Sequence, residues 1–274
     1  HTESKLQETF RYNDSIANVA GEFVMKNGEQ IEKEITTKAK VDKPQVYLLD
    51  DQVNGQLDSS GKLAQVVKTI RKNDPKGSIA VIARYNYILD ESREALREFR
   101  LQQHVDFWTF HRAKGLEADY TIILGLFSGE MGFPNARVNE APLEALLPEL
   151  DGYPFSEERR LFYVGLTRAR HKCYLIANPL SPSSFVTELL TQQYEIDIVS
   201  RKFESAYLKN LKCPNCSSGY FQRRSGPYGN FYVCSTGIAY DVKANVCPAC
   251  EAPLVDSRSK RRCINTTCGH IEKI

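Results

Sequence analysis

The sequence has no long apolar stretch. None of its runs approaches the roughly 20 consecutive apolar residues that a membrane-spanning helix needs. Residues 1–5 read His-Thr-Glu-Ser-Lys and lack the basic and apolar segments of a secretion signal. These absences predict a cytoplasmic protein with no membrane partner. Because the chain also lacks an initiator methionine and ends directly after a cysteine motif, we expect it to be a piece of a longer protein.

Two motifs of nucleotide-hydrolysing enzymes are missing as well. The chain contains no Gly-x-x-x-x-Gly-Lys-Ser/Thr phosphate loop, and no acidic Mg²⁺-binding motif is recognisable. A chain without these parts should not hydrolyse a nucleoside triphosphate on its own.

Cysteine is scarce in the first 212 residues, where Cys173 is the only one. It lies in the apolar run Lys-Cys-Tyr-Leu-Ile, which favours a buried strand residue over a nucleophile. The other seven cysteines lie between Cys213 and Cys268. The length of 274 residues accordingly suits one large domain followed by a small cysteine-rich one.

The net charge of +2 conceals an uneven distribution. Residues 200–274 hold 12 Lys/Arg against 5 Asp/Glu, which leaves 24 against 29 in residues 1–199. A basic tail favours a polyanion such as nucleic acid, although charge alone is equally typical of a solvated surface on a small domain.

Residues 44–178 alternate short apolar, β-rich runs with helical stretches, which predicts an α/β domain with a mainly parallel sheet. The expected strands are 45–49, 78–84, 105–110, 121–126 and 173–177. The expected helices are 57–71, 89–99, 157–170 and 183–192. Residues 127–154, rich in Gly, Pro and acidic residues, predict an excursion at the sheet rim, with a short helix near 140–147.

Residues 109–120, Thr-Phe-His-Arg-Ala-Lys-Gly-Leu-Glu-Ala-Asp-Tyr, form a polar loop between two apolar strands. A loop at the carboxyl end of a strand is where α/β sheets bind ligands, and its His, Lys, Glu and Asp residues suit a polar one. The alternative is that the loop is polar only for solubility.

Residues 157–170 predict a helix on which Arg160, Tyr163, Thr167 and Arg170 share one face. A guanidinium at the end of such a helix can reach a phosphate. The alternative is an amphipathic helix with acid–base pairs on its exposed face.

Together, these two stretches resemble motifs V and VI of the UvrD-like superfamily 1 DNA helicases. Phe10-Arg11-Tyr12-Asn13 resembles motif IV of the same family. The resemblance implies the second, C-terminal motor domain of an ATP-dependent DNA helicase, with a RecA-like P-loop NTPase fold of a parallel sheet and flanking helices. Such an enzyme couples ATP hydrolysis to movement on single-stranded DNA and to duplex unwinding.

The resemblance also assigns residues to ATP. It places Phe10 against the adenine, Arg11 at the γ-phosphate and Glu117 at the ribose. Arg168 becomes an arginine finger, so that Arg11 and Arg168 are the expected catalytic residues. ATP with Mg²⁺ is then shared with the missing N-terminal motor domain of the same parent chain. We expect Arg11, Glu117 and Arg168 to converge on one edge of the sheet.

For DNA, the resemblance points to Thr109 and His111, and the expected partners are single-stranded DNA and duplex junctions. A different possibility is a non-catalytic DNA-binding module with a degenerate motor domain. A nuclease-helicase subunit would need a further acidic metal cluster, and the sequence offers none.

In the tail, Cys247, Cys250, Cys263 and Cys268 have the spacing of a Cys₄ zinc site. A disulfide framework is the alternative, but the N-terminus gives no sign of secretion.

Upstream, Cys213, Cys216 and Cys234 surround Arg223, Arg224, Tyr228 and Phe231. This stretch resembles the C-terminal zinc ribbons of type IA topoisomerases, which bind single-stranded DNA, and it implies the same role for those arginines and aromatic residues. Tyr228, Phe231 and Tyr232 could equally form the core of a tiny domain. A fourth cysteine would fall near Tyr240, so Asp241, His270 or a cysteine beyond the chain end is needed to complete this site.

The predicted organisation is therefore a motor domain at residues 1–192, a linker at 193–211 and a zinc-ribbon, nucleic-acid-binding tail at 212–274.

Overall fold

The computed structural model describes residues 8–9, 11–28, 36–129, 131–135, 153, 155–179, 181–191, 194–204, 221–226, 229–234, 243–249, 252–257, 259–264 and 269–273. The chain divides into two units. The first contains His1–Gly125, Val138–Ile176 and Tyr194–Val199, and the second contains Leu126–Arg137, Ala177–Gln193 and Ser200–Ile274. None of the described helices is long and apolar enough to cross a bilayer.

The central sheet of the first unit has six strands, in the order β10-β3-β9-β8-β6-β7. Their bounds are β3 (Val46–Asp50), β6 (Ile79–Ala83), β7 (Val105–Thr109), β8 (Ala118–Leu126), β9 (Ala169–Ala177) and β10 (Asp197–Ile198). The pairs β10–β3, β6–β7 and β6–β8 are parallel. The expected α/β fold with a parallel sheet is thus confirmed.

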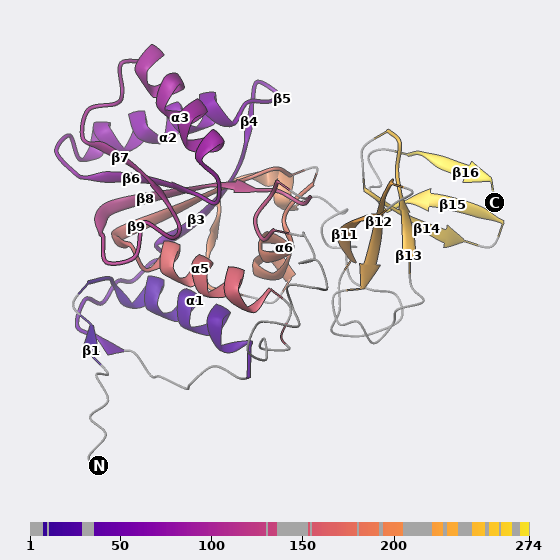
Figure 1. Cartoon of the computed structure of the whole chain (residues 1–274), viewed down its shortest axis with the longest axis horizontal. Coiled ribbons are helices and arrows are strands. Elements are labelled where there is room, and N and C mark those ends of the chain that lie inside the picture. Colours follow the sequence, from indigo (N-terminus) through magenta and orange to yellow (C-terminus); the bar gives the residue numbers. More distant parts are fainter. Residues whose placement is uncertain are drawn as a thin grey trace, which may run out of the picture. The chain divides into compact units, whose positions relative to one another are not determined.

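Helices cover both faces of this sheet (Figure 1). On one face lie α2 (Ser59–Asn73) and α3 (Asn86–Glu98), and on the other lie α1 (Asp14–Met25) and α5 (Ser156–Leu166). The short pairs β1 (Glu8–Thr9) with β2 (Thr36–Thr37) and β4 (Gln52–Val53) with β5 (Gln56–Leu57) form two further small sheets.

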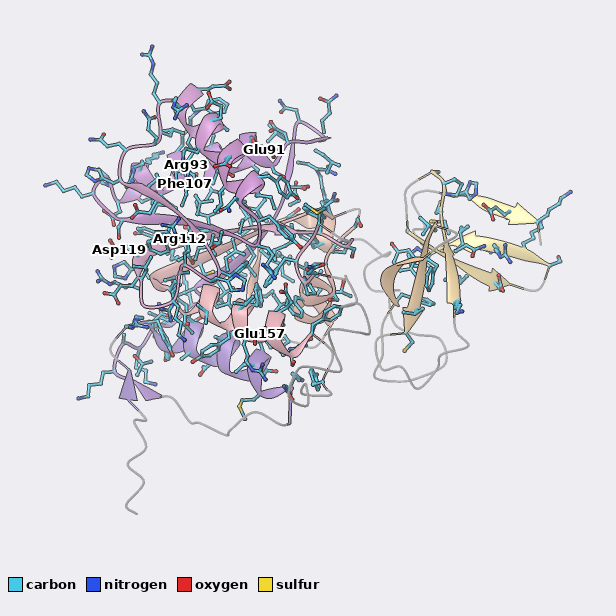
Figure 2. The ribbon with its side chains drawn as sticks, viewed as in Figure 1. Glu91, Arg93, Phe107, Arg112, Asp119 and Glu157 are labelled. Atoms are coloured by element: carbon cyan, nitrogen blue, oxygen red, sulfur yellow. The ribbon has the colours of Figure 1, made fainter. Side chains whose placement is uncertain are left out.

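The α2–α3 face is packed by apolar side chains at helical spacing. Leu63, Val67 and Ile70 on α2 meet the fully buried Ile79 and Val81 of β6. At the rim, the guanidinium of Arg93 on α3 lies 4.7 Å from the ring centroid of Phe107 on β7 (Figure 2).

On the other face, α5 packs against α1. The rings of Phe23 and Phe162 meet edge to face with centroids 4.9 Å apart. Arg159 is buried between the helices: its Nη1 donates to the Phe23 carbonyl at 2.7 Å and its guanidinium lies 4.1 Å from the Phe23 ring. One side chain therefore satisfies a backbone carbonyl and covers an aromatic face.

The connection from β7 to β8 crosses the sheet without a helix. Thr109 pairs with Ala83 at the carboxyl end of β6, whereas Tyr120 pairs with Ile79 at its amino end. Residues 110–117 must therefore run from the carboxyl ends of the parallel strands back to their amino ends. The expectation that this whole polar stretch lies at a carboxyl end is correct for Thr109 but wrong for Glu117, which directly precedes β8.

Two predicted boundaries are wrong at the same place. Helix α5 ends at Leu166, not near residue 170, and β9 begins at Ala169, not at Cys173. The hydroxyl of Thr167 donates to the carbonyls of Tyr163 and Val164 at 2.9 and 3.2 Å, at the end of the helix. Thr167 and Arg170 consequently do not share a helical face with Arg160.

In the second unit, α6 (Ser184–Thr191) begins after Ser183, whose Oγ accepts from the Val186 amide at 3.3 Å. This matches the predicted helix at 183–192. A short 3₁₀ helix, η1 (Arg201–Glu204), follows. Part of the expected linker at 193–211 is β10, which pairs with β3 in the first unit. The excursion's expected helix at 140–147 lies outside the described residues.

The tail forms an antiparallel six-stranded meander in chain order. Its strands are β11 (Phe221–Gly226), β12 (Gly229–Cys234), β13 (Lys243–Val246), β14 (Pro253–Ser257), β15 (Lys260–Cys263) and β16 (Ile271–Lys273).

The close approach of α5 to the crossing segment depends on Gly165. A Cβ atom at this position would lie 2.4 Å from Cε1 of the buried Phe110 and 3.2 Å from Ile123 Cδ1. We expect Gly165→Ala to lower the free energy of unfolding by about 1–3 kcal/mol, because neither side chain has room to move. Gly21→Ala on α1, where a Cβ meets nothing within 4 Å, is the control and should stabilise the chain by up to about 1 kcal/mol. Urea unfolding of both variants tests this, and equal stability of the two would contradict the packing described.

Candidate functional site

Charged residues gather at the amino ends of β8 and β9. Glu117 directly precedes β8, Arg168 directly precedes β9, and Arg170 is the second residue of β9. The Ala118 amide donates to the Arg168 carbonyl at 3.0 Å, which holds the two strand starts side by side. Arg11 reaches the same place from the segment before α1.

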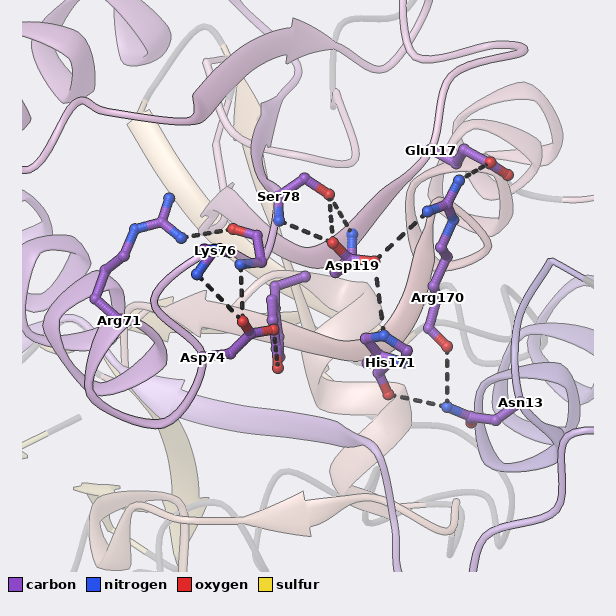
Figure 3. Close-up of polar contacts among 11 residues, drawn as sticks. Asn13, Arg71, Asp74, Lys76, Ser78, Glu117, Asp119, Arg170 and His171 are labelled. Carbon is purple, nitrogen blue, oxygen red and sulfur yellow. Dashed lines mark hydrogen bonds and ion pairs between the residues drawn. The ribbon is translucent and has the colours of Figure 1, made fainter.

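Two arginines share the Glu117 carboxylate. Arg11 Nε lies 3.2 Å from Oε2, and Arg170 Nη2 donates to Oε1. Arg170 Nη1 also lies 3.6 Å from Asp119 Oδ1, so that Arg170 spans both carboxylates (Figure 3). The hydrogen bond from Arg170, together with the charge of Arg11, lowers the pKa of Glu117 below its usual value.

Asn13 joins the Arg11 segment to β9. Its Oδ1 accepts from the Ile16 amide at 3.1 Å and so caps α1, while its Nδ2 donates to the carbonyls of His171 at 2.9 Å and Arg170 at 3.3 Å (Figure 3). The side chain is buried. It is used from both ends, which fixes the start of α1 against the start of β9.

Asp119 ties the same edge to β6. It accepts from the backbone amide and the hydroxyl of Ser78, both at 2.8 Å, and lies 3.6 Å from His171 Nε2 (Figure 3). Its neighbour Tyr120 donates to Asp74 at 3.2 Å. The edge is thus a continuous polar network.

Arg168 is buried at the centre of this edge, with 7% of its surface exposed. Its guanidinium donates to the carbonyls of Val164 at 2.9 Å and Leu116 at 3.1 Å, and to the Thr167 hydroxyl at 3.2 Å. These acceptors are neutral. Burial, followed by repulsion from Arg11, lowers the pKa of Arg168, although an arginine remains charged at neutral pH.

Two tyrosines line the Arg168 pocket. The hydroxyls of Tyr12 and Tyr163 lie 3.5 Å apart, and burial raises the pKa of Tyr12. Tyr12 is therefore neutral at physiological pH and does not compensate the charge of Arg168.

The expected convergence of Arg11, Glu117 and Arg168 is therefore present in the structure. Their roles in binding ATP stay predictions, and Phe10 lies outside the described residues. Thr109 and His111 lie apart from the cluster, where β7 ends. The Thr109 hydroxyl accepts from the Arg112 amide at 3.4 Å, and His111 is exposed.

The family resemblance gives no role to Arg170, Asn13 or Asp119, although Asp119 belongs to the polar loop and Arg170 to the predicted helix face. A signal for Arg170 existed: on a strand, residues two apart share a face, so Arg170 follows Arg168 onto the same edge once β9 begins at Ala169. The double use of Asn13 has no signature in the sequence beyond its suitability as a helix cap.

In the tail, the described cysteines Cys234, Cys247 and Cys263 are all buried. Cys213, Cys216, Cys250 and Cys268 lie outside the described residues, as does Tyr228. Within the described part of the chain, no three or more His, Cys, Asp or Glu side chains surround a possible metal position.

The aromatic residues of the tail were expected either to stack on nucleic-acid bases or to form a small core, and the structure places them differently. Tyr232 is buried and meets the Phe221 ring at 6.4 Å, which makes it part of a core. Phe231, its neighbour on β12, is only half-buried, with Lys243 Nζ 5.9 Å from its ring. Arg223 and Arg224 lie on β11, in register with Tyr232 and Phe231.

The strand directions separate the two cysteine sets. Because the sheet is an antiparallel meander, Cys247 after β13 and Cys263 at the end of β15 lie at one end, and Cys234 at the end of β12 lies at the other. His270 lies beside Cys263, whose amide donates to its carbonyl at 3.0 Å, and its ring is 3.2 Å from Glu272. His270 therefore does not complete the Cys234 set.

Residues 88–179 match the UvrD-like helicase C-terminal domain family. The chain is 41% identical to DNA helicase IV of Escherichia coli K12 over 184 residues, which cover 66% of this chain and 25% of that protein. It is 27% identical to the ATP-dependent DNA helicase PcrA of Staphylococcus aureus over 187 residues, which cover 64% of this chain and 22% of that protein. The alignments span about a quarter of the length of these relatives or less.

A solved C-terminal domain of a possible DNA helicase from Lactobacillus plantarum superposes with a TM-score of 0.44 at 18% identity, covering 70% of this chain and 99% of that one. The sequence matches make residues 88–179 homologous to a helicase C-terminal domain.

The Arg170–Glu117 contact predicts a pH effect. A carboxylate whose folded pKa is lowered contributes stability at neutral pH, and that stability is lost as the pH falls through the folded pKa. We expect Arg170→Gln to raise the pKa of Glu117 toward its usual value of about 4.3. The loss of unfolding free energy, at most about 1 kcal/mol for such exposed groups, should be seen at pH 7 and shrink as the pH falls through the lowered pKa of the folded state.

Carboxyl NMR titration and urea unfolding measure the two effects. Arg160→Gln, which breaks the exposed 3.0 Å pair with Glu157 on α5, is the matched control and should leave the pKa of Glu117 unchanged. An unchanged pKa in Arg170→Gln would show that the contact does not hold the carboxylate.

Proposed function

We propose that this chain is the second motor domain of a cytoplasmic ATP-dependent DNA helicase, followed by a zinc-ribbon tail that binds single-stranded DNA. The observation that carries the proposal is the gathering of Arg11, Arg168 and Arg170 around Glu117 at one sheet edge, beside a stretch homologous to a helicase C-terminal domain. The N-terminal motor domain of the same parent chain completes the site.

The edge suits a polyphosphate. Three guanidinium groups face two carboxylates, Glu117 and Asp119, so positive charge is in excess. Both carboxylates are engaged by cations, which leaves Mg²⁺ to be held by the first motor domain. ATP supplies the phosphoryl group. In this proposal Arg11 and Arg168 neutralise the charge of its phosphates, Glu117 bonds its ribose and Phe10 stacks on its base.

Arg168 can exchange its partners for a phosphate. Its present acceptors are uncharged carbonyls and a hydroxyl, whereas a phosphate adds an opposite charge and can accept two N–H groups of the guanidinium at once. As the arginine finger, it stabilises the charge that spreads over the γ-phosphoryl oxygens in the transition state.

The crossing segment 110–117 couples this chemistry to DNA. Thr109 and His111 stand at the carboxyl edge as the proposed DNA contacts, and Glu117 stands at the opposite, amino edge. Arg168 donates to the Leu116 carbonyl, so a change in its bonding reaches the segment directly.

In the tail, we propose that Cys247, Cys250, Cys263 and Cys268 bind Zn²⁺, and that Cys213, Cys216 and Cys234 belong to a second site. Cys247 and Cys263 are buried at one end of the meander, and each opens a short connection that contains a further cysteine. Arg223, Arg224, Tyr228 and Phe231 are the proposed DNA contacts of the first ribbon. The half-buried Phe231 beside Lys243 has the stacking surface and the cation that single strands need.

Replacing Arg168 tests the motor proposal in the full-length parent enzyme. Arg168→Ala should lower DNA-stimulated ATP turnover by about 10³-fold or more while ATP binding is retained. Arg168→Lys, which keeps the charge but not the planar fork, should recover only a small part. Arg160→Ala on the exposed side of α5 is the control. Turnover within threefold of wild type in Arg168→Ala, with unchanged melting, would remove Arg168 from the role and leave the motor proposal without its main support.

Metal analysis tests the zinc proposal. Protein purified without chelator should contain at least one Zn²⁺ per chain, and Cys263→Ser should release it, because three thiolates close the tetrahedron poorly. The control is Cys173→Ala in β9, where burial raises the thiol pKa to about 12 and the residue is far from the thiolate form that binds metal. Zinc content below one per chain, or unaffected by Cys263→Ser, would defeat the assignment.

A further inference from the structure

The buried side of the tail sheet changes between β13 and β14. Tyr232 and Ala244 pair in register on one side and are buried. Leu254 and Cys263 pair on the opposite side and are buried as well. Asn245 pairs with Leu254, so these two residues lie on the same side of the sheet. Ala244 is the neighbour of Asn245 on β13 and therefore lies on the opposite side.

Within one continuous sheet, the buried residues of β12 and β13 thus lie on one side and those of β14 and β15 on the other. In β14, β15 and β16, the exposed side is therefore the one that carries Val255, Arg262 and Ile271. We call Lys260, Arg262, Ile271 and Lys273 the outer face.

The outer face is cationic and exposed. Lys260 pairs in register with Lys273, and Arg262 pairs with Ile271, whose surface is 51% exposed. Among the described residues, none of the three cations has an ion pair or a side-chain hydrogen bond, and none of the described side chains of β14–β16 on this side is acidic.

The opposite side of the same strands is different. Asp256 pairs with Arg261 at 3.1 Å, and Glu272 lies 3.2 Å from His270. The acids of these three strands thus stand on one side with partners, and the cations of the other side stand without them. A surface that serves only solubility would mix the two signs.

We propose that the outer face binds the sugar-phosphate backbone of single-stranded nucleic acid, with Ile271 against a base or sugar. Cations on adjacent strands are about 4.8 Å apart and alternate residues of one strand about 6.6 Å apart, so the face offers a row of charges to successive phosphates. An exposed aliphatic side chain between them adds a contact that does not depend on salt. The inference rests on the proposed function of the tail and extends it from the first ribbon to the second.

Arg261 and Arg262 provide a matched pair on one strand. They have the same side chain and opposite sides, and only Arg261 has an acidic partner. Binding of the whole chain to a fluorescent oligothymidylate is measured from 50 to 200 mM salt. We expect Arg262→Ala to reduce the slope of log affinity against log salt by about 0.7, and the triple Lys260→Ala/Arg262→Ala/Lys273→Ala variant to reduce it by about 2. Arg261→Ala should not change the slope.

Ile271→Ala should weaken binding at every salt concentration without changing the slope. Zinc content equal to wild type in all variants shows that the tail is folded. The outer face would be excluded as the binding surface if Arg261→Ala and Arg262→Ala gave equal slopes, or if the triple variant left the slope unchanged. The proposed DNA-binding function of the tail would still stand if the wild-type chain bound the oligothymidylate. A wild-type chain that binds no oligothymidylate sinks both. Loss of binding to phosphatidylserine vesicles with unchanged DNA affinity would assign the face to membranes and overturn the inference.

Discussion

The site depends on one buried amide. Asn13 caps α1 with its oxygen and holds two carbonyls of β9 with its nitrogen. A cap contributes about 1 kcal/mol, and an orphaned buried polar group costs about 1–3 kcal/mol, so this residue outweighs any exposed ion pair nearby. Without it, α1 would still pack against α5 through Phe23 and Phe162, but that apolar contact does not set the position of β9. The hydrogen bonds of Asn13 to β9 therefore help to hold Arg11, two residues away, at hydrogen-bonding distance from Glu117.

The charged side chains at this edge are therefore positioned by Asn13 and by backbone hydrogen bonds, and not by their ion pairs. Exposed ion pairs such as Arg11–Glu117 contribute at most about 1 kcal/mol, which makes them easy to exchange for a ligand. Arg168 is held differently, because it is buried and its hydrogen-bond acceptors are uncharged. The pKa of Tyr12 beside it is raised by burial, so this tyrosine does not cancel its charge. Hydrogen bonds fix the backbone here while the electrostatic partners are replaceable, which is the combination that the proposed polyphosphate site would need.

Sequence reasoning recovered the elements whose apolar pattern is strong. The sheet order brings β6 and β8 together as buried runs, and α2 and α3 carry the predicted spacing. It missed the start of β9 because Arg170, His171 and Lys172 interrupt the apolar pattern at an edge where they face solvent or partners. It also could not see that segment 110–117 crosses the sheet, since that path depends on the register of β7 and β8 with β6 and on the space left by Gly165. The cysteine spacing predicted where connections lie but not which end of the meander they share.

The charges of the outer face do not help to stabilise the tail. A domain of this size gains only about 3–5 kcal/mol from a single apolar core, and the buried residues of this tail are divided between two sides of one sheet. The zinc proposed for the cysteine connections would add stability at the sheet ends, and the outer face would take no part in it. Lys260, Arg262 and Lys273 repel one another, so together they weaken the folded tail slightly. A polyanion would account for a face of one charge sign that costs stability. The acids of these strands lie on the other side, Asp256 beside Arg261 and Glu272 beside His270, where they would not repel that polyanion.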